Sequence, residues 1–463
     1  MADNRIEQVE NGLPNKFESA PQQGRSYTLA ERMAEYRVPG VSIAVFSGGK
    51  IEWAKGYGLR ARDEAGAVDS ETIFQAASIS KPVAALAILR LFEARGLDVN
   101  ADVNQYLTSW KIPAVDGWQP RLTLRQLLSH SAGTTAHGFF GYSQNESVPT
   151  LLQILDGLQP ANSEAVRVDT MPGAQYRYSG GGTLIAQQMA CDLAAQSFPE
   201  IAREWVFEPL EMTRSRYDQP LSPQYHDNAA RGHYYPGAPV EGGWYTMPEL
   251  AAAGLWTTPS DIARFALAIQ AAHQRKASPI STQVADWMLT EVIQAEGHSL
   301  GMGTFIYRSA NAAHFGHGGD NVGYKNQFRA YFENSDQGAA IMTNGDQGSS
   351  LIEEIMGSIT KVYEWPEHSP ETEHPEANAT TPYAAYTGSY RLGDLALAIA
   401  LTGSQLLLLA SGQNPLELRP LANGKFNVQA LQAAITFERE ADGHISGLIF
   451  EQNGQQLKAT HLR

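Results

Sequence analysis

The chain has 463 residues, and its composition, 43% hydrophobic and 18% charged, is typical of a folded globular protein and not of a disordered chain. The length exceeds that of one ordinary domain, so we expect two or more domains. A net charge of −15 argues against nucleic acid or an anionic membrane surface as the partner.

No apolar run approaches the length that spans a bilayer, so we expect no membrane insertion. The first stretch, MADNRIEQVENGLPNKF, has neither the basic nor the apolar region of a signal peptide. We therefore expect a cytoplasmic protein, with an exported mature form as the alternative. The 12 histidines form no H-E-x-x-H motif and no Cys/His cluster, so we expect no metal site and no cofactor.

The first elements predicted along the chain are two strands. Apolar residues alternate with small or polar ones over 41–45, the glycine pair 48–49 can turn the chain, and KIEWAKGYG (50–58) continues it. KPVAALAILRLFEARGL (81–97) then predicts a buried helix. Further helices are predicted at 122–131, 183–196 and 259–274. Ser260 is the predicted N-cap of the last one.

From about residue 305 the pattern returns to strands, at TFIYRS (304–309), NQFRAYFE (326–333) and GAAIMTN (338–344). An early hairpin, a helical middle and late strands together predict one antiparallel sheet built from both ends of the segment, with helices packed on it. The predicted fold class is therefore α+β, and the predicted first domain comprises residues 1–366.

Segment 367–382, EHSPETEHPEANATTP, is rich in Pro, Glu and Thr and predicts a linker. Residues 383–463 differ from it in pattern. Apolar and small residues alternate over 395–401, and the dipeptides DG (442–443) and NG (453–454) are strong signals for two-residue hairpins. This last part predicts a small all-β sheet or barrel as a second domain.

Two serine motifs compete for a catalytic role. GHSLG (297–301) matches the G-x-S-x-G pattern of a nucleophile elbow, which needs a strand before the serine and a helix after it. Here a helical pattern precedes the motif and a strand-like pattern follows it. We therefore predict no catalytic role for Ser299.

The second motif, SISK (78–81), is an S-x-x-K pattern. Ser78 and Lys81 lie one turn apart on the same face of a helix, so the lysine amine can reach the serine hydroxyl. Pro82 is tolerated only near the first turn, which places Ser78 at or just before the helix N-terminus, where unpaired N–H groups favour a developing negative charge. A serine hydroxyl needs a neighbouring base of this kind to act as a nucleophile.

Several stretches, spread over about residues 25–365, resemble the penicillin-binding-protein-like serine hydrolases, the group around class C β-lactamases, D-aminopeptidases and related esterases. In chain order they are FQAASISK (74–81), RQLLSHSAG (125–133), MPGAQYRYSGGG (171–182), GLWTTPSDIARF (254–265) and FGHGGDNVGY (315–324). The resemblance implies a β-lactamase/transpeptidase-like antiparallel sheet flanked by helices, with an all-α lobe. The segment from YTGSY (386–390) onwards resembles the lipocalin-like barrels appended to many members.

The resemblance also implies roles for individual residues. Ser78 would be the nucleophile, Lys81 its base or the partner that adjusts its pKa, and Tyr178 the second proton carrier. His317 would line the site from a strand. The backbone N–H groups of Ser78 and Asp320 would form the oxyanion hole.

Three other groups are interpreted from their setting. Gly318 and Gly319 let a strand backbone come close to a bound substrate. His130, in a helix-to-loop segment, is interpreted as a structural residue that satisfies backbone groups. His314 is interpreted as an ordinary strand residue.

The second motif departs from the family at Gly180, where the resemblance implies an Asn that binds a substrate amide. Its absence favours acyl transfer from esters or small amides over efficient β-lactam hydrolysis. The sequence thus predicts a serine hydrolase that acts through an acyl-enzyme on a small ester, amide or peptide. Two alternatives stay open: a peptidase for short peptides, D-residue peptides included, and a penicillin-binding or ligand-binding protein without turnover. A homo-oligomer is a further expectation.

Overall fold

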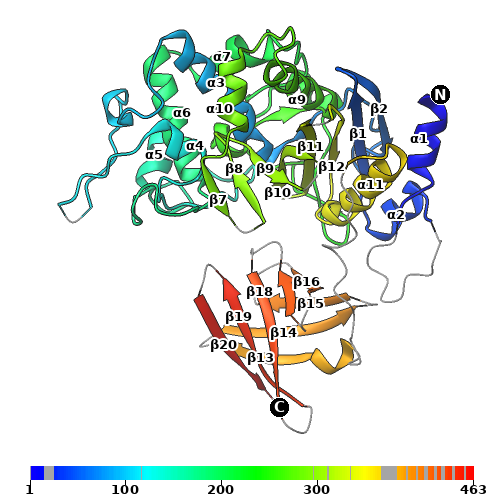
Figure 1. Cartoon of the computed structure of the whole chain (residues 1–463). Helices are drawn as coiled ribbons and strands as arrows, with labels where there is room; N and C mark the ends of the chain where they lie inside the picture. Colours follow the sequence, from blue (N-terminus) through cyan, green and yellow to red (C-terminus); the bar gives the residue numbers. More distant parts are fainter. Residues whose placement is uncertain are drawn as a thin grey trace. The chain divides into compact units, whose positions relative to one another are not determined.

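The computed structural model describes residues 2–14, 26–115, 117–295, 297–309, 312–333 and 335–366, and then 383–392, 395–402, 405–410, 416–421, 425–428, 433–440, 444–452 and 455–462. The described residues of 2–13 and 27–366 form one compact unit, and those of 383–462 belong to a second (Figure 1). The predicted linker 367–382 lies outside the described residues.

An antiparallel sheet of eight strands forms the centre of the first unit, in the order β2-β1-β12-β11-β10-β9-β8-β7 (Figure 1). Its strands are β1 (Gly40–Ser47), β2 (Lys50–Gly58), β7 (Ile293–Ala295), β8 (His298–Leu300), β9 (Phe305–Arg308), β10 (Ala313–Asn321), β11 (Tyr324–Glu333) and β12 (Gly338–Thr343). The early hairpin β1–β2 joins the late strands through β12. The predicted sheet built from both ends is therefore confirmed.

Eleven α-helices are described in this unit: α1 (Ala2–Glu10), α2 (Leu29–Glu35), α3 (Ser80–Ala94), α4 (Leu124–Leu128), α5 (Leu151–Asp156), α6 (Gly180–Ala194), α7 (Phe198–Ala202), α8 (Leu250–Ala253), α9 (Pro259–His273), α10 (Thr282–Leu289) and α11 (Gly348–Val362). Every residue of β12 is buried, and both α9 and α11 pack on it, so helices cover both faces of the sheet there. None of the described helices has the length and apolarity to cross a membrane.

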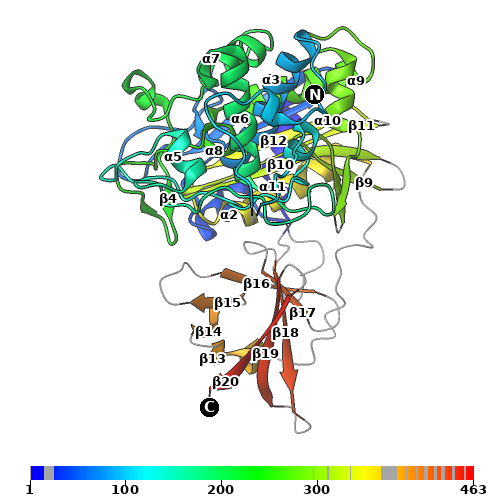
Figure 2. The same cartoon turned by 90° about the vertical axis from the view of Figure 1, so that its left-hand side faces the viewer.

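The chain between β2 and β7 supplies the helical lobe. In it α3, α6 and α7 lie side by side, and α8 packs against α3 and α6 (Figures 1 and 2). Twelve of the 15 residues of α3 are buried, which explains why its sequence is apolar on almost every face. The predicted α+β class is confirmed.

The predicted cap of α9 is wrong by two residues. Thr258, and not Ser260, is the N-cap, and its hydroxyl accepts a hydrogen bond from the N–H of Asp261. Pro259 explains the difference, because a proline disfavours helical geometry in the residue before it and fits the first helical position itself. Thr258 is accordingly extended, with φ −116° and ψ 158°.

The second unit is a closed barrel of eight antiparallel strands in sequence order. They are β13 (Gly388–Leu392), β14 (Leu395–Thr402), β15 (Gln405–Ala410), β16 (Leu416–Pro420), β17 (Lys425–Val428), β18 (Ala433–Arg439), β19 (Ile445–Gln452) and β20 (Gln455–Leu462). Tyr390, Phe426 and Phe437 belong to its hydrophobic core. The predicted hairpin dipeptides at 442–443 and 453–454 lie outside the described residues, although the strands that flank them do pair.

One carboxyl group in the helical lobe is buried without compensation. Glu249, the residue before α8, is fully buried, and neither carboxylate oxygen has a hydrogen-bond partner among the described residues. Burial raises the pKa of this carboxyl from 4.5 to about 8.

This burial predicts a pH-dependent stability. Between pH 4.5 and about 8 the unfolded chain releases a proton that the folded chain keeps, so the free energy of unfolding falls as pH rises through this window. The fall is at most about 1.4 kcal/mol per pH unit. Glu249→Gln removes it, so the variant should gain thermal stability relative to the wild type between pH 5 and pH 8. Exposed Glu291→Gln is the control, and parallel pH–stability curves for Glu249→Gln and the wild type would refute the assignment.

Candidate active site

Ser78 lies in a short 3₁₀ turn, Ala77–Ile79, that leads directly into α3. Ala77 has a left-handed backbone, φ +51°, which a residue with a side chain adopts at a cost of about 1–3 kcal/mol. Pro82 sits at the third position of α3, inside the first turn as the sequence required. The serine therefore stands on a strained turn at the N-terminal end of a buried helix.

Lys81 is hydrogen-bonded to that serine and is only 5% exposed. Its Nζ lies 3.0 Å from the Ser78 Oγ and 2.8 Å from the carbonyl oxygen of Ala252 in α8. The same Nζ lies 5.0 Å from the centroid of the Tyr178 ring. The structure thus brings together Ser78, Lys81 and Tyr178, three residues that the sequence analysis selected.

Strand β10 forms the opposite wall. Its pairing with β9 stops at Gly316, and the strand continues next to the turn of Ser78. Side chains alternate along a strand, so residues 317, 319 and 321 share one face, and all three are buried. A β-carbon on Gly319 would lie 2.2 Å from the carbonyl oxygen of Ala76, so the two backbones meet at a distance that only glycine permits.

His317 is a neutral imidazole in this site. Its Nδ1 donates to the Gly318 carbonyl oxygen at 2.5 Å, which leaves Nε2 as an acceptor. Burial first, and the Lys81 charge second, lower the pKa of His317 to about 3. Nε2 is buried without a hydrogen-bond partner among the described residues, and the ring centroid lies 6.2 Å from that of Tyr178. The side chain can therefore accept a hydrogen bond but cannot supply a proton.

Asp320 lies on the other face of β10. Its side chain is exposed and forms an ion pair with Lys325, the residue paired with it on β11. Whatever this residue contributes to the site must therefore come from its backbone.

Three polar residues that the sequence analysis missed join β10 and β11 to the serine turn. The Asn321 amide donates to Gln75 Oε1 at 2.8 Å, and the Asn326 amide donates to the Gln75 carbonyl oxygen at 2.9 Å. Asn321 also lies 3.3 Å from the Ala253 carbonyl oxygen of α8. Side chains alternate along a strand, so counting from Gly319 could have placed Asn321 on the face toward the site. Nothing in the sequence indicates Gln75 as its partner.

Gly180 is the first residue of α6 and is buried, with a φ outside the left-handed region. A β-carbon here would lie 2.7 Å from Phe139 Cε2 and 3.3 Å from the His137 carbonyl oxygen. The Gly180 N–H donates to that same carbonyl oxygen at 3.1 Å. An aromatic edge thus occupies the space into which a side chain at position 180 would grow.

Ser299 lies elsewhere, in the middle of β8, paired with Gln294 and Ile306. A strand and a short turn follow it in place of a helix, so the elbow geometry is absent. His314 lies in β10 before the part that faces Ser78, and its ring stacks on Tyr307. Neither residue contacts Ser78 or Lys81 through a described interaction.

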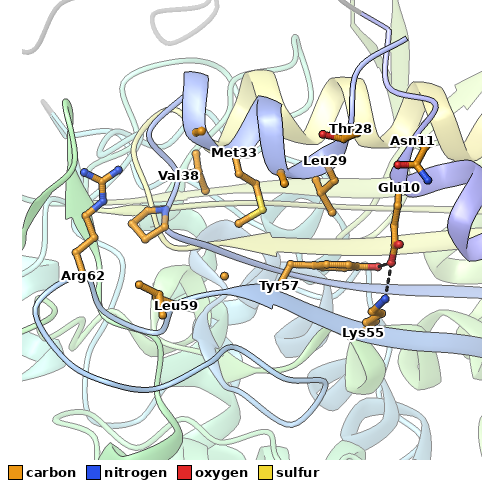
Figure 3. A pocket seen from close by; sticks show the side chains of 14 residues that line it. Glu10, Asn11, Thr28, Leu29, Met33, Val38, Lys55, Tyr57, Leu59 and Arg62 are labelled. Atoms are coloured by element: carbon orange, nitrogen blue, oxygen red, sulfur yellow. Dashed lines mark hydrogen bonds and ion pairs between the residues drawn. The ribbon is translucent and has the colours of Figure 1, made fainter.

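The structure also contains a cavity of about 640 Å³ between α2 and β2 (Figure 3). Leu29, Met33, Val38 and Leu59 give it an apolar lining, and Glu10 at one end binds Lys55 and Tyr57. None of the predicted site residues lines this cavity.

With this geometry in view, comparison with known proteins matches residues 27–355 to the Beta-lactamase family. Penicillin-binding protein 4* of Bacillus subtilis (strain 168) is 23% identical over 453 residues, which cover 93% of this chain and 96% of that protein.

Two solved structures share the fold. The octameric penicillin-binding protein homologue from Pyrococcus abyssi has a TM-score of 0.65 and 21% identity and covers 93% of this chain and 98% of its own. The D-amino acid amidase from Ochrobactrum anthropi SV3 has a TM-score of 0.58 and 17% identity, with 78% and 99% covered. The family match spans well over half of the sequence and contains both the SISK turn and β10, so the chain belongs to the Beta-lactamase family of serine hydrolases.

Proposed function

We propose that this serine hydrolase acts through an acyl-enzyme on Ser78 and prefers small esters to β-lactams. The observation that carries the first part is the position of Lys81 Nζ, 3.0 Å from the Ser78 hydroxyl and buried beside Tyr178. A base at hydrogen-bond distance is what a serine needs to become a nucleophile.

In the proposed acylation step, Lys81 first releases the proton of its resting ammonium to solvent. The Ser78 hydroxyl then gives its proton to the free amine of Lys81 while Oγ bonds to the substrate carbonyl carbon. The oxyanion that forms is bound by the backbone N–H groups of Ser78 and Asp320. The proton then passes by way of Tyr178 to the leaving alcohol or amine as its bond to the carbonyl carbon breaks. Water completes the cycle by attacking the acyl-enzyme, with the same groups moving the proton in reverse.

His317 and Gly319 shape the substrate side of this site. The unpaired Nε2 of His317 is an acceptor for a donor on the substrate, because a buried acceptor without a partner is unfavourable. Gly319 allows the substrate to lie along the β10 backbone near the Ser78 turn.

The preference for esters rests on Gly180. The position offers no side-chain amide, and the Phe139 edge lies where such a side chain would begin. A substrate amide gains no directed hydrogen bond there, while an ester with its better leaving group needs less assistance.

A second candidate is a peptidase or amidase for substrates with D-residues. The fold shared with the D-amino acid amidase favours it, over 78% of this chain. A paired screen of p-nitrophenyl esters, D- and L-amino-acid amides and a chromogenic cephalosporin separates the two candidates.

We also propose that the protein is a homo-oligomer, because the penicillin-binding protein homologue from Pyrococcus abyssi, which shares its fold, is octameric.

Replacing the nucleophile tests the assignment most directly. Ser78→Ala should abolish ester turnover and labelling by a fluorophosphonate, because no other described serine has a lysine amine within hydrogen-bond distance. Ser299→Ala is the matched control and should leave both nearly unchanged. Intact-mass spectrometry detects the adduct, and an adduct that persists on Ser78→Ala would overturn the assignment.

Removing the phenol hydroxyl tests the proton path. Tyr178→Phe should lower kcat by about 10²- to 10⁴-fold, the usual effect of losing a positioned acid or base. The ring contacts with Phe305 and His317 survive this substitution, so the fold should not change. A variant within a few-fold of the wild type would mean that Lys81 alone handles the proton.

Substrate preference is tested at Gly180. Gly180→Asn should raise kcat/KM for nitrocefin relative to p-nitrophenyl acetate, by up to the roughly 1.5 kcal/mol that one hydrogen bond contributes. The new β-carbon would meet Phe139 at 2.7 Å, so we expect the full gain only in Gly180→Asn with Phe139→Ala, which clears the space. Phe139→Ala alone is the control. A ratio that falls in the well-folded double variant would refute this account.

A further inference from the structure

We infer that His130 is a positioning residue that holds Tyr178 in place for the reaction. The inference rests on the proposed function of Tyr178 as a proton carrier, but its structural part can be measured separately. His130 follows α4, is 5% exposed and has a left-handed backbone with φ +53°.

Both chain neighbours of Tyr178 are hydrogen-bonded to this one histidine. The N–H of Arg177 donates to the His130 carbonyl oxygen at 2.7 Å, and the N–H of Ser179 donates to His130 Nδ1 at 3.2 Å. The peptide unit that joins Tyr178 to Ser179, and the unit that enters Arg177, are therefore both held by a single residue. These two hydrogen bonds restrict the backbone from which the Tyr178 ring extends.

The imidazole also contacts the ring itself. The centroids of the His130 and Tyr178 rings lie 4.4 Å apart at an interplanar angle of 40°. This is the shortest of the three described ring contacts of Tyr178, since Phe305 and His317 lie 6.3 and 6.2 Å away. His130 thus restrains both the backbone and the ring of Tyr178.

His130 itself does not fit an acid or base. Its Nδ1 lone pair is occupied by the Ser179 N–H, so that atom carries no proton and is not free to accept one. Burial lowers the pKa of His130 well below its ordinary value, and the charge of Lys81 lowers it further. The imidazole stays neutral at working pH, and its contribution is geometric.

The left-handed backbone provides a conservative variant. Asn is the non-glycine residue that best tolerates a positive φ, and its Oδ1 is separated from Cβ by the same number of bonds as Nδ1 of histidine. His130→Asn should therefore keep the hydrogen bonds from the Ser179 and Arg177 N–H groups, whereas His130→Ala loses the side-chain atom that accepts from Ser179. Both variants lose the ring and both keep the backbone carbonyl that Arg177 uses, so the difference between them isolates the Ser179 hydrogen bond.

The experiment compares the two variants in kcat, in the pH profile of kcat/KM and in crystal structures. His130→Ala should lower kcat by about 10- to 100-fold, since a small misplacement of a reacting group has effects of this size, and should displace Tyr178 from Lys81. His130→Asn should restore kcat to within about fivefold of the wild type, because the acceptor is kept. His314→Asn, at a histidine outside the machinery, is the control and should leave kcat unchanged.

In a Tyr178→Phe background, His130→Ala should lower kcat by no more than about twofold, because the hydroxyl that it positions is already gone. If Tyr178 keeps its place in the His130→Ala crystal structure, or if a folded His130→Asn is as impaired as His130→Ala, the inference is wrong. If His130→Ala does not fold, His130→Asn is compared with the wild type, and a loss of kcat greater than about fivefold in the folded variant overturns the inference. Failure of the proposed function gives a different result, since Tyr178→Phe would then retain activity whatever His130 does.

Discussion

The arrangement of the site depends on one buried amine. Lys81 reaches Ser78 in the turn just before its own helix, the Ala252 carbonyl oxygen on α8 and the ring of Tyr178 just before α6. A cation withdrawn from water is tolerated only where such partners replace its hydration. The packing of α8 against α3 and α6 is therefore a condition for the chemistry as well as for the fold. The uncompensated Glu249 directly before α8 lies in the same part of the lobe, so its ionisation acts on the element that carries the Ala252 carbonyl.

The sheet supplies the other half of the site through its backbone. Gly319 lets β10 approach the Ser78 turn more closely than any side chain would allow, and amides of Asn321 and Asn326 fix that approach through Gln75. These bonds join residues far apart in sequence, so the site closes only when the sheet and the helical lobe have both formed. Alternation along β10 turns the Asp320 side chain to the opposite face, where it pairs with Lys325.

Local sequence patterns predicted much of the fold and much of the candidate site. The spacing of Ser78 and Lys81 follows from the helical repeat, the rejection of Ser299 follows from the order of helix and strand, and alternation along the late strands gave the sheet. The failures have physical causes too. The cap of α9 was misplaced because the effect of Pro259 on Thr258 outweighed the propensity of Ser260. The Ala252 carbonyl and the Gln75 contacts were not predictable, since a backbone acceptor and a tertiary partner leave no mark on the local sequence.

For the two histidines of the site, residue type alone did not indicate what role each has. His130 and His317 both carry pKa values lowered by burial and by Lys81, and each uses Nδ1 in a backbone hydrogen bond, yet the two bonds run in opposite directions. His130 accepts from a peptide N–H and so fixes the chain around Tyr178. His317 donates to a carbonyl oxygen and so leaves Nε2 as an unpaired acceptor beside the same ring. The tautomer chosen by each backbone contact therefore separates a residue that supports the site from one that can meet a substrate. Lys81 is the one cation that these contacts place against Tyr178.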